Sequence, residues 1–85
     1  MAMRVHVRLG EPFWRAVGQR NLEADLPPGT DLRALLAWLC REYPALEQEM
    51  REAPPHFFVG DEEAHEETLL ADGNRVHLVW PVAGG

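Results

Sequence analysis

One amphipathic helix pattern limits the folds open to this chain more than any other feature of its sequence. Apolar residues recur at the spacing i, i+3, i+4, i+7, i+8 and i+11, which is typical of a helix with one buried face. The residues of this stripe are Leu32, Leu35, Leu36, Leu39, Cys40 and Tyr43. Thr30 is the predicted N-cap, with Asp31 favourably placed near the positive end of the helix dipole, and Pro44 is predicted to end the helix. Because 85 residues form one domain with one core, we expect this helix to cover one face of a sheet.

Two segments before the helix alternate apolar and polar residues, as half-buried strands do. In residues 3 to 9, the odd-numbered residues are apolar and are predicted to point inward, whereas the even-numbered residues are Arg4, His6 and Arg8. Residues 20 to 26 alternate in the same way, and the Pro-Pro-Gly sequence that follows is predicted to end that strand. The stretch from Phe13 to Gly18 is predicted to be a connecting segment with apolar anchors.

The segment after the helix is predicted to be less regular. Residues 45 to 53 are expected to add a short helical piece, and residues 56 to 61 a short strand that enters a turn. A run of glutamates follows and is predicted to be a solvated loop; it consists of Glu62, Glu63, Glu66 and Glu67. Residues 68 to 70 are expected to be briefly extended before a turn at Asp72-Gly73.

The last predicted strand covers residues 75 to 82 and alternates again. Its inward residues are predicted to be Val76, Leu78 and Trp80, and its outward residues Arg75, His77 and Val79. Trp38 lies off the apolar stripe of the helix and is therefore predicted to be exposed or to face a partner.

The order of these elements predicts an α+β fold, in which one main helix packs on one face of a mixed sheet. If the last strand returns parallel and adjacent to the first, the helix is the crossover that covers the sheet. One helix covers one face only, so the other face must be solvated or covered by a partner.

Composition and motifs exclude several classes of function. The net charge of −6 argues against nucleic acid as a partner, and no apolar run is long enough to span a membrane. A single cysteine, Cys40, rules out an internal disulfide and favours the cytoplasm, as does a start without a signal-peptide pattern; we expect Cys40 to be a helix core residue. The four histidines include no i, i+4 pair, so no metal site is expected. No phosphate-binding glycine loop and no arrangement of nucleophile and base can be found, so the chain is expected to bind no cofactor and not to be an enzyme.

All eight basic residues are arginine, and lysine is absent. The first interpretation is codon bias in the genome that encodes the chain, which favours arginine over lysine. A second interpretation is that the absence of lysine protects an activated acyl group on the same chain from amide formation.

Residues 68 to 85 resemble the end of the ubiquitin-like sulfur carriers. The pattern is Leu-x-Asp-Gly-Asn-x-Val-x-Leu-x-x-Pro-Val-Ala-Gly-Gly. The resemblance is strongest to the small subunit of molybdopterin synthase (MoaD), with the thiazole-pathway carrier ThiS as a relative, and the stretches 13–18, 30–44 and 59–61 agree with it. It implies the β-grasp fold, with residues 1–80 as a single domain and residues 81–85 as a flexible tail ending in Gly-Gly.

The resemblance also implies a mechanism in which Gly85 is the working residue. An E1-like adenylating enzyme of the MoeB type uses ATP to activate the Gly85 carboxylate, and sulfur from a sulfurtransferase converts it to a thiocarboxylate. The large subunit of molybdopterin synthase (MoaE type) then uses this sulfur in molybdenum cofactor biosynthesis. Catalysis comes from these partners. Pro81, Val82, Ala83 and Gly84 form the tail that delivers Gly85.

The sheet face opposite the helix is the predicted docking surface for these partners. Its predicted residues are Arg4, His6, Arg8, Arg75, His77 and Val79, most of them cationic or potentially so. Trp80, which adjoins the tail, is also a predicted partner-binding residue. An ordinary solvated face is the alternative. For the whole chain, the alternatives are a carrier for thiamin, cysteine or tRNA thiolation, a protein modifier, or a β-grasp interaction module in which Gly-Gly has no role.

Overall fold

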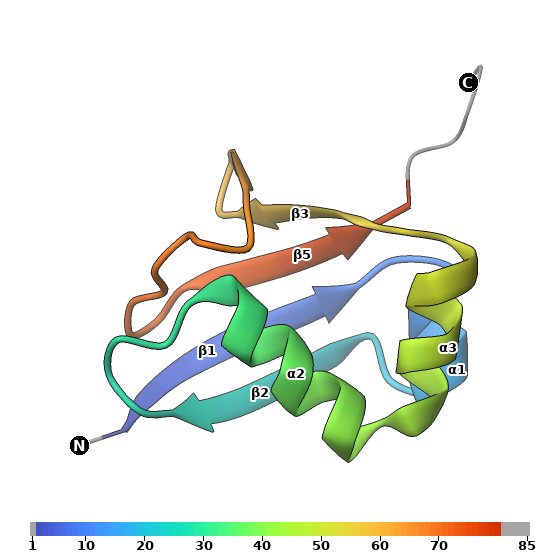
Figure 1. Cartoon of the computed structure of the whole chain (residues 1–85), viewed down its shortest axis with the longest axis horizontal. Helices are drawn as coiled ribbons and strands as arrows, with labels where there is room; N and C mark the ends of the chain where they lie inside the picture. Colours follow the sequence, from blue (N-terminus) through green and yellow to red (C-terminus); the bar gives the residue numbers. More distant parts are fainter. Residues whose placement is uncertain (1, 81–85) are drawn as a thin grey trace.

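The computed structural model describes residues 2 to 80 and shows one five-stranded mixed sheet (Figure 1). The strands are β1 (Met3–Leu9), β2 (Asn21–Leu26), β3 (His56–Val59), β4 (Glu62–Ala64) and β5 (Arg75–Val79). They lie in the order β2-β1-β5-β3-β4. Only the central pair, β1 and β5, is parallel; the other neighbours are antiparallel. The predicted return of the last strand beside the first is therefore confirmed.

Three helices lie against the sheet: α1 (Phe13–Val17), α2 (Leu32–Glu42) and α3 (Pro44–Glu52). In Figure 1, α2 crosses the sheet obliquely, and α1 and α3 lie together beyond one end of it. The single main helix of the prediction is α2. The predicted short helical piece is α3, and Leu46 anchors it in the core.

The stretch from Phe13 to Gly18, predicted as a connecting segment with apolar anchors, contains the short helix α1, which the sequence analysis did not predict. Phe13 is fully buried, and the Gly18 N–H donates to the Trp14 carbonyl oxygen at 2.7 Å. Gly18 adopts φ 87°, a left-handed conformation that suits glycine at a helix end. A helix of five residues is too short to produce a readable period in the sequence.

The start of α2 differs from the prediction, whereas its end does not. Asp31, not Thr30, caps α2: its Oδ1 accepts from the Ala34 N–H at 2.9 Å. The Thr30 hydroxyl instead donates to the Pro27 carbonyl oxygen at 2.6 Å and closes the preceding turn. Pro44 follows the end of α2, as predicted, and is also the first residue of α3, where no backbone donor is needed.

The acidic run is not wholly a loop. Its first part pairs with β3 as the edge strand β4, and the side chain of Ala64 is buried while the glutamates stay exposed. Farther along, Leu69 makes only an isolated bridge with Asp31. The segment from residue 62 to residue 69 is thus paired at both ends, whereas its acidic composition predicted a solvated loop.

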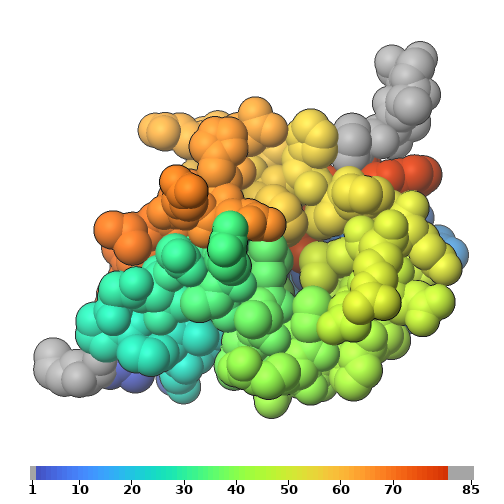
Figure 2. Space-filling view, in the orientation of Figure 1, coloured from blue at the N-terminus to red at the C-terminus, as the bar shows by residue number. Residues whose placement is uncertain are grey.

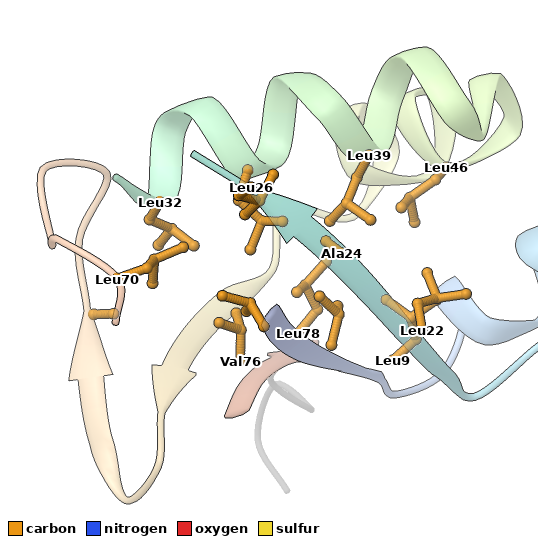
Figure 3. Close-up of a cluster of buried hydrophobic side chains, with 14 of the residues drawn as sticks. Leu9, Leu22, Ala24, Leu26, Leu32, Leu39, Leu46, Leu70, Val76 and Leu78 are labelled. Atoms are coloured by element: carbon orange, nitrogen blue, oxygen red, sulfur yellow. The ribbon is translucent and has the colours of Figure 1, made fainter. Parts of the chain in front are cut away.

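The core lies between the helices and one face of the sheet. Figure 3 shows Leu32 and Leu39 of α2, and Leu46 of α3, on the helical side of this core, across from Ala24 and Leu78 of the sheet. From outside, α2 and α3 cover the lower middle and right of this face, and the orange segment that follows β3 covers its upper left (Figure 2). The side chains with no more than 1% exposure are Val5, Val7, Phe13, Ala24, Leu32, Leu35, Leu39, Leu46, Val76 and Leu78.

Two residues of α2 depart from their predicted environment. Trp38 is half-buried and packs against the core, so the prediction of an exposed tryptophan was wrong. Cys40 is half-buried rather than a fully buried core residue. Burial raises the pKa of the Cys40 thiol, and the nearby Glu47 carboxylate raises it further.

Leu35→Ala should lower the free energy of unfolding by about 2–5 kcal/mol, because the leucine is fully buried and its removal leaves a cavity. Leu69→Ala is the matched control: Leu69 is 70% exposed, so its loss should change stability by less than about 0.5 kcal/mol. Urea unfolding followed by circular dichroism measures both. Equal effects of the two substitutions would contradict the described core.

Candidate functional site

The predicted working residue lies outside the described part of the chain. Gly85 and the tail residues Pro81, Val82, Ala83 and Gly84 all follow Trp80, the last described residue. The division into a domain of residues 1–80 and a flexible tail therefore stays a prediction. What the structure does describe is the point at which the sheet ends and the surface around that point.

The last strand ends at Val79 rather than at residue 82 because its neighbours end there. On one side, the Gly10 N–H donates to the Leu78 carbonyl oxygen at 2.9 Å, directly after the end of β1. On the other side, His56, the first residue of β3, pairs with Val79. Trp80 has no strand beside it and is 49% exposed, so its predicted inward orientation was wrong.

Gly10 is the residue in closest contact with this end of β5. A Cβ atom at position 10 would lie 3.1 Å from the Leu78 carbonyl oxygen, closer than a Cβ normally approaches backbone. The carbonyl of Gly10 also accepts from the Trp14 N–H at 3.1 Å, which ties α1 to the same point. The position at which the chain leaves the sheet is therefore fixed by β1, β3 and α1 together.

The structure brings together the central residues of the predicted docking face. The parallel register places His6 beside Arg75 and Arg8 beside His77. All four side chains point away from the helices, since the residues that alternate with them are buried. Val79 follows on the same face and is 37% exposed.

Arg4 lies on the same face but is already engaged by the chain itself. Its Nε donates to Asp25 Oδ1 at 3.1 Å, and its Nη1 lies 3.5 Å from Glu23 Oε2. The hydrogen bond to Asp25 and the charges of both carboxylates raise the pKa of Arg4. Its backbone N–H donates to Asp72 Oδ1 at 2.7 Å. The face is therefore of mixed charge, not the cationic patch that the sequence suggested.

The carboxylates of β2 are the functional signal that the sequence prediction missed. Asn21, Glu23 and Asp25 are the outward residues of that strand, and consecutive antiparallel strands place them beside Arg8, His6 and Arg4. The alternation that placed the arginines on this face could have placed these carboxylates there as well.

The far side of the face belongs to β3 and β4. Phe58 pairs with His77 in the sheet and is half-buried. His56 Nδ1 lies 3.2 Å from Glu63 Oε2, so these two side chains of β3 and β4 pair with each other. Both sides of the face are thus occupied by residues that have partners.

A hollow of about 350 Å³ lies between these two sides, over β2, β1 and β5. It is lined by His6, Val7, Arg8, Asn21, Leu22, Glu23, Arg75 and His77. Within residues 2 to 80, neither Arg8 nor Arg75 has a carboxylate within ion-pair distance. The hollow is therefore a recess of mixed polar and apolar lining, and its two guanidinium groups have no ion-pair partner among residues 2 to 80.

The described residues contain neither a metal-ligand cluster nor a membrane-spanning helix. No group of three or more histidine, cysteine or acidic side chains converges between residues 2 and 80. None of the three described helices is long and apolar enough to cross a bilayer.

The sequence and the fold are both similar to known proteins. The family model of the ThiS family matches residues 8–85. No curated protein sequence is significantly similar to the chain.

Several solved structures are similar over nearly their whole length. Small archaeal modifier protein 1 of Haloferax volcanii has a TM-score of 0.83 at 19% identity, over 94% of this chain and 99% of that chain. A protein–protein complex of subunits 1 and 2 of the molybdopterin-converting factor of Helicobacter pylori matches with a TM-score of 0.70 at 27% identity, over 98% and 100%. Urm1 of Trypanosoma brucei matches with a TM-score of 0.73 at 18% identity, over 99% and 97%. These likenesses confirm the predicted ubiquitin-like β-grasp fold.

Gly10→Ala should destabilise the domain by about 1–3 kcal/mol, because the added methyl group presses on the Leu78 carbonyl group at the end of β5. At an unstrained position the same substitution stabilises by about 0.4–1 kcal/mol, so the sign of the change is diagnostic. Urea unfolding gives the sign, and amide chemical shifts should move at Leu78 and Val79. A stabilised variant with unmoved shifts would contradict the close contact.

Proposed function

Since the chain belongs to the ThiS family of ubiquitin-like sulfur carriers, we propose that it carries sulfur as a thiocarboxylate on Gly85. The observation that carries this proposal is the family match, which extends through the Gly-Gly sequence at residues 84 and 85. The described part of the chain offers a binding surface but no catalytic arrangement. We propose that partner proteins supply the chemistry.

A carboxylate needs activation before it can accept sulfur, because it is anionic and has no good leaving group. We propose that an E1-like enzyme of the MoeB type transfers AMP from ATP to the Gly85 carboxylate and releases pyrophosphate. The terminal sulfur of a sulfurtransferase persulfide then displaces AMP, and a thiol reduces the resulting acyl disulfide to release the thiocarboxylate, which is a nucleophile. The carrier itself binds no cofactor in this scheme.

The tail is proposed to reach into the active site of each partner while the domain stays outside. Five residues span at most about 17 Å when fully extended. Gly84 and Gly85 carry no Cβ atoms and suit a narrow channel, in which a partner backbone approaches closely. The open face of the sheet, with Val79 and Trp80 at the root of the tail, is proposed to dock on the partner.

We assign the carrier to molybdopterin synthase as its small subunit. Subunit 1 of the Helicobacter pylori molybdopterin-converting factor forms a complex with subunit 2, and the present chain is 27% identical to the matched structure. A large subunit of the MoaE type is the corresponding proposed partner. The site of sulfur transfer is proposed to be the cytoplasm, where the single cysteine stays reduced.

A second candidate function is protein modification or thiolation in another pathway. The likeness to small archaeal modifier protein 1 and to Urm1 favours keeping this candidate. Both candidates use an activated C-terminal glycine, so the product and the partner distinguish them. An isopeptide conjugate would indicate a modifier, and a complex with the synthase large subunit would indicate molybdopterin synthesis.

The intact mass of the protein from its native host tests the carrier proposal directly. A fraction of molecules should be heavier by the mass difference between sulfur and oxygen, and tandem mass spectrometry should place that difference on Gly85. Treatment with an alkylating reagent should modify this fraction at its terminus. If the heavier fraction were absent from cells that actively synthesise the cofactor, the proposal would be contradicted.

Gly84→Ala should leave stability unchanged but lower adenylation by at least about tenfold, because a methyl group obstructs a narrow channel. Pyrophosphate exchange with the purified adenylating enzyme measures the activation, and urea unfolding measures the stability. Ala71→Gly, at an exposed position of the described domain, is a control that should not alter activation. Full adenylation of the Gly84 variant would remove the channel argument, although not the carrier function.

A further inference from the structure

We propose that the hollow over β2, β1 and β5 receives a carboxylate side chain of the adenylating enzyme, bound between Arg8 and Arg75. This inference rests on the proposed function, since it names the chemistry by which the activating partner recognises the carrier. It concerns a polar contact at the middle of the sheet face. It is separate from the apolar residues at the root of the tail.

The first argument is the pattern of partners among the eight arginines. Four of them, Arg4, Arg15, Arg33 and Arg51, form ion pairs, and the guanidinium of Arg20 lies 4.5 Å from the centre of the Trp14 ring. Among the described residues, only Arg8, Arg41 and Arg75 have neither kind of partner. Two of these three line one hollow.

The second argument is that Arg8 and Arg75 have no carboxylate partner among the described residues, although the chain is acidic. Acidic residues outnumber arginines by 14 to 8, and four of the six arginines outside the hollow form an ion pair with a carboxylate. A carboxylate brought by another protein would supply the missing partner. Hydrogen bonds to a guanidinium are strong because donor and acceptor are both charged.

The third argument is the geometry of the two strands. Arg8 lies beside His77 and Arg75 beside His6, so the two arginines occupy diagonal positions on adjacent parallel strands. Diagonal neighbours in a sheet have Cα atoms about 7–8 Å apart, within reach of two long side chains that converge on one group. The two oxygens of a carboxylate can each accept from a different guanidinium.

Glu23 also lines the hollow and determines where an incoming carboxylate can lie. Glu23 Oε2 is 3.5 Å from Arg4 Nη1, which compensates part of its charge on the β2 side. An incoming carboxylate would be repelled from that side and attracted toward β1 and β5. His6 and His77 flank this position as additional hydrogen-bond donors or acceptors.

The test compares Arg8→Gln and Arg75→Gln with the control Arg41→Gln. Arg41 is an exposed residue in the last turn of α2, on the helical side of the sheet, so the control removes the same charge far from the hollow. Adenylation is followed by pyrophosphate exchange with the purified adenylating enzyme of the same organism. Each hollow variant should raise the KM for the carrier about 30-fold or more and leave kcat unchanged, because a buried interfacial charge loses its partner. Arg41→Gln should leave both constants unchanged.

Charge reversal identifies the partner group. Arg8→Glu should be poorly adenylated, and one Asp→Arg or Glu→Arg substitution on the docking surface of the enzyme should restore its KM. Circular dichroism and urea unfolding of each carrier variant separate loss of docking from loss of the fold.

Three outcomes would overturn the inference. In the first outcome, the KM of both hollow variants equals that of the wild type. In the second, Arg41→Gln raises the KM as much as the hollow variants do, which would indicate a general charge effect. A saturable shift of the Arg8 and Arg75 amide signals on titration with inorganic phosphate would indicate a site for a small free anion. Failure of the wild-type carrier to be adenylated at all would instead overturn the proposed function, and is thus distinguishable.

Discussion

The parallel pairing of β1 with β5 is the interaction on which the rest of this structure depends. It joins segments from the two ends of the described chain, and backbone hydrogen bonds hold it at both ends, from His6 N–H to the Asn74 carbonyl oxygen and from Gly10 N–H to the Leu78 carbonyl oxygen, each 2.9 Å. A parallel pair requires a long crossover connection, and α2 lies within that connection and covers the sheet. The fully buried residues of the two strands then form the floor of the core. The same pairing leaves the alternate residues on the open face, so one contact builds both the core and the candidate docking surface.

The long periodic elements could be predicted from the sequence because their apolar residues recur on the side that is buried. The alternation in β1 and β2, the positions Leu32, Leu35 and Leu39 of the α2 stripe, and the inward residues Val76 and Leu78 were assigned correctly. The boundaries could not be predicted to the same degree. Both Thr30 and Asp31 are suitable N-caps, and the choice depends on the Pro27 carbonyl oxygen, which engages the Thr30 hydroxyl. Strand β5 ends at Val79 because its neighbours end there, which is a property of the sheet and not of its own residues.

The candidate docking face was predicted in part, and the missing part has a physical reason. Alternation placed the arginines and histidines outward, and the parallel register placed them side by side. Their charge environment depends on the third strand, β2, whose carboxylates engage Arg4 and leave Arg8 and Arg75 without partners. A prediction made strand by strand gives the members of a face but not the pairs among them. The tail residues 81–85 lie outside the described chain, so the working end of the molecule is still inferred from family membership alone.

The half-buried thiol of Cys40 has a consequence for the proposed function, in which Gly85 is activated as an adenylate. A glycyl adenylate reacts readily with thiolates, and a carrier with an accessible thiolate could consume its own cargo by forming an internal thioester. Desolvation and the Glu47 carboxylate disfavour the thiolate of Cys40, and the chain has no lysine amine as a second competitor. Under the proposed function, the described domain therefore offers few nucleophiles that could attack the glycyl adenylate before the sulfur is transferred.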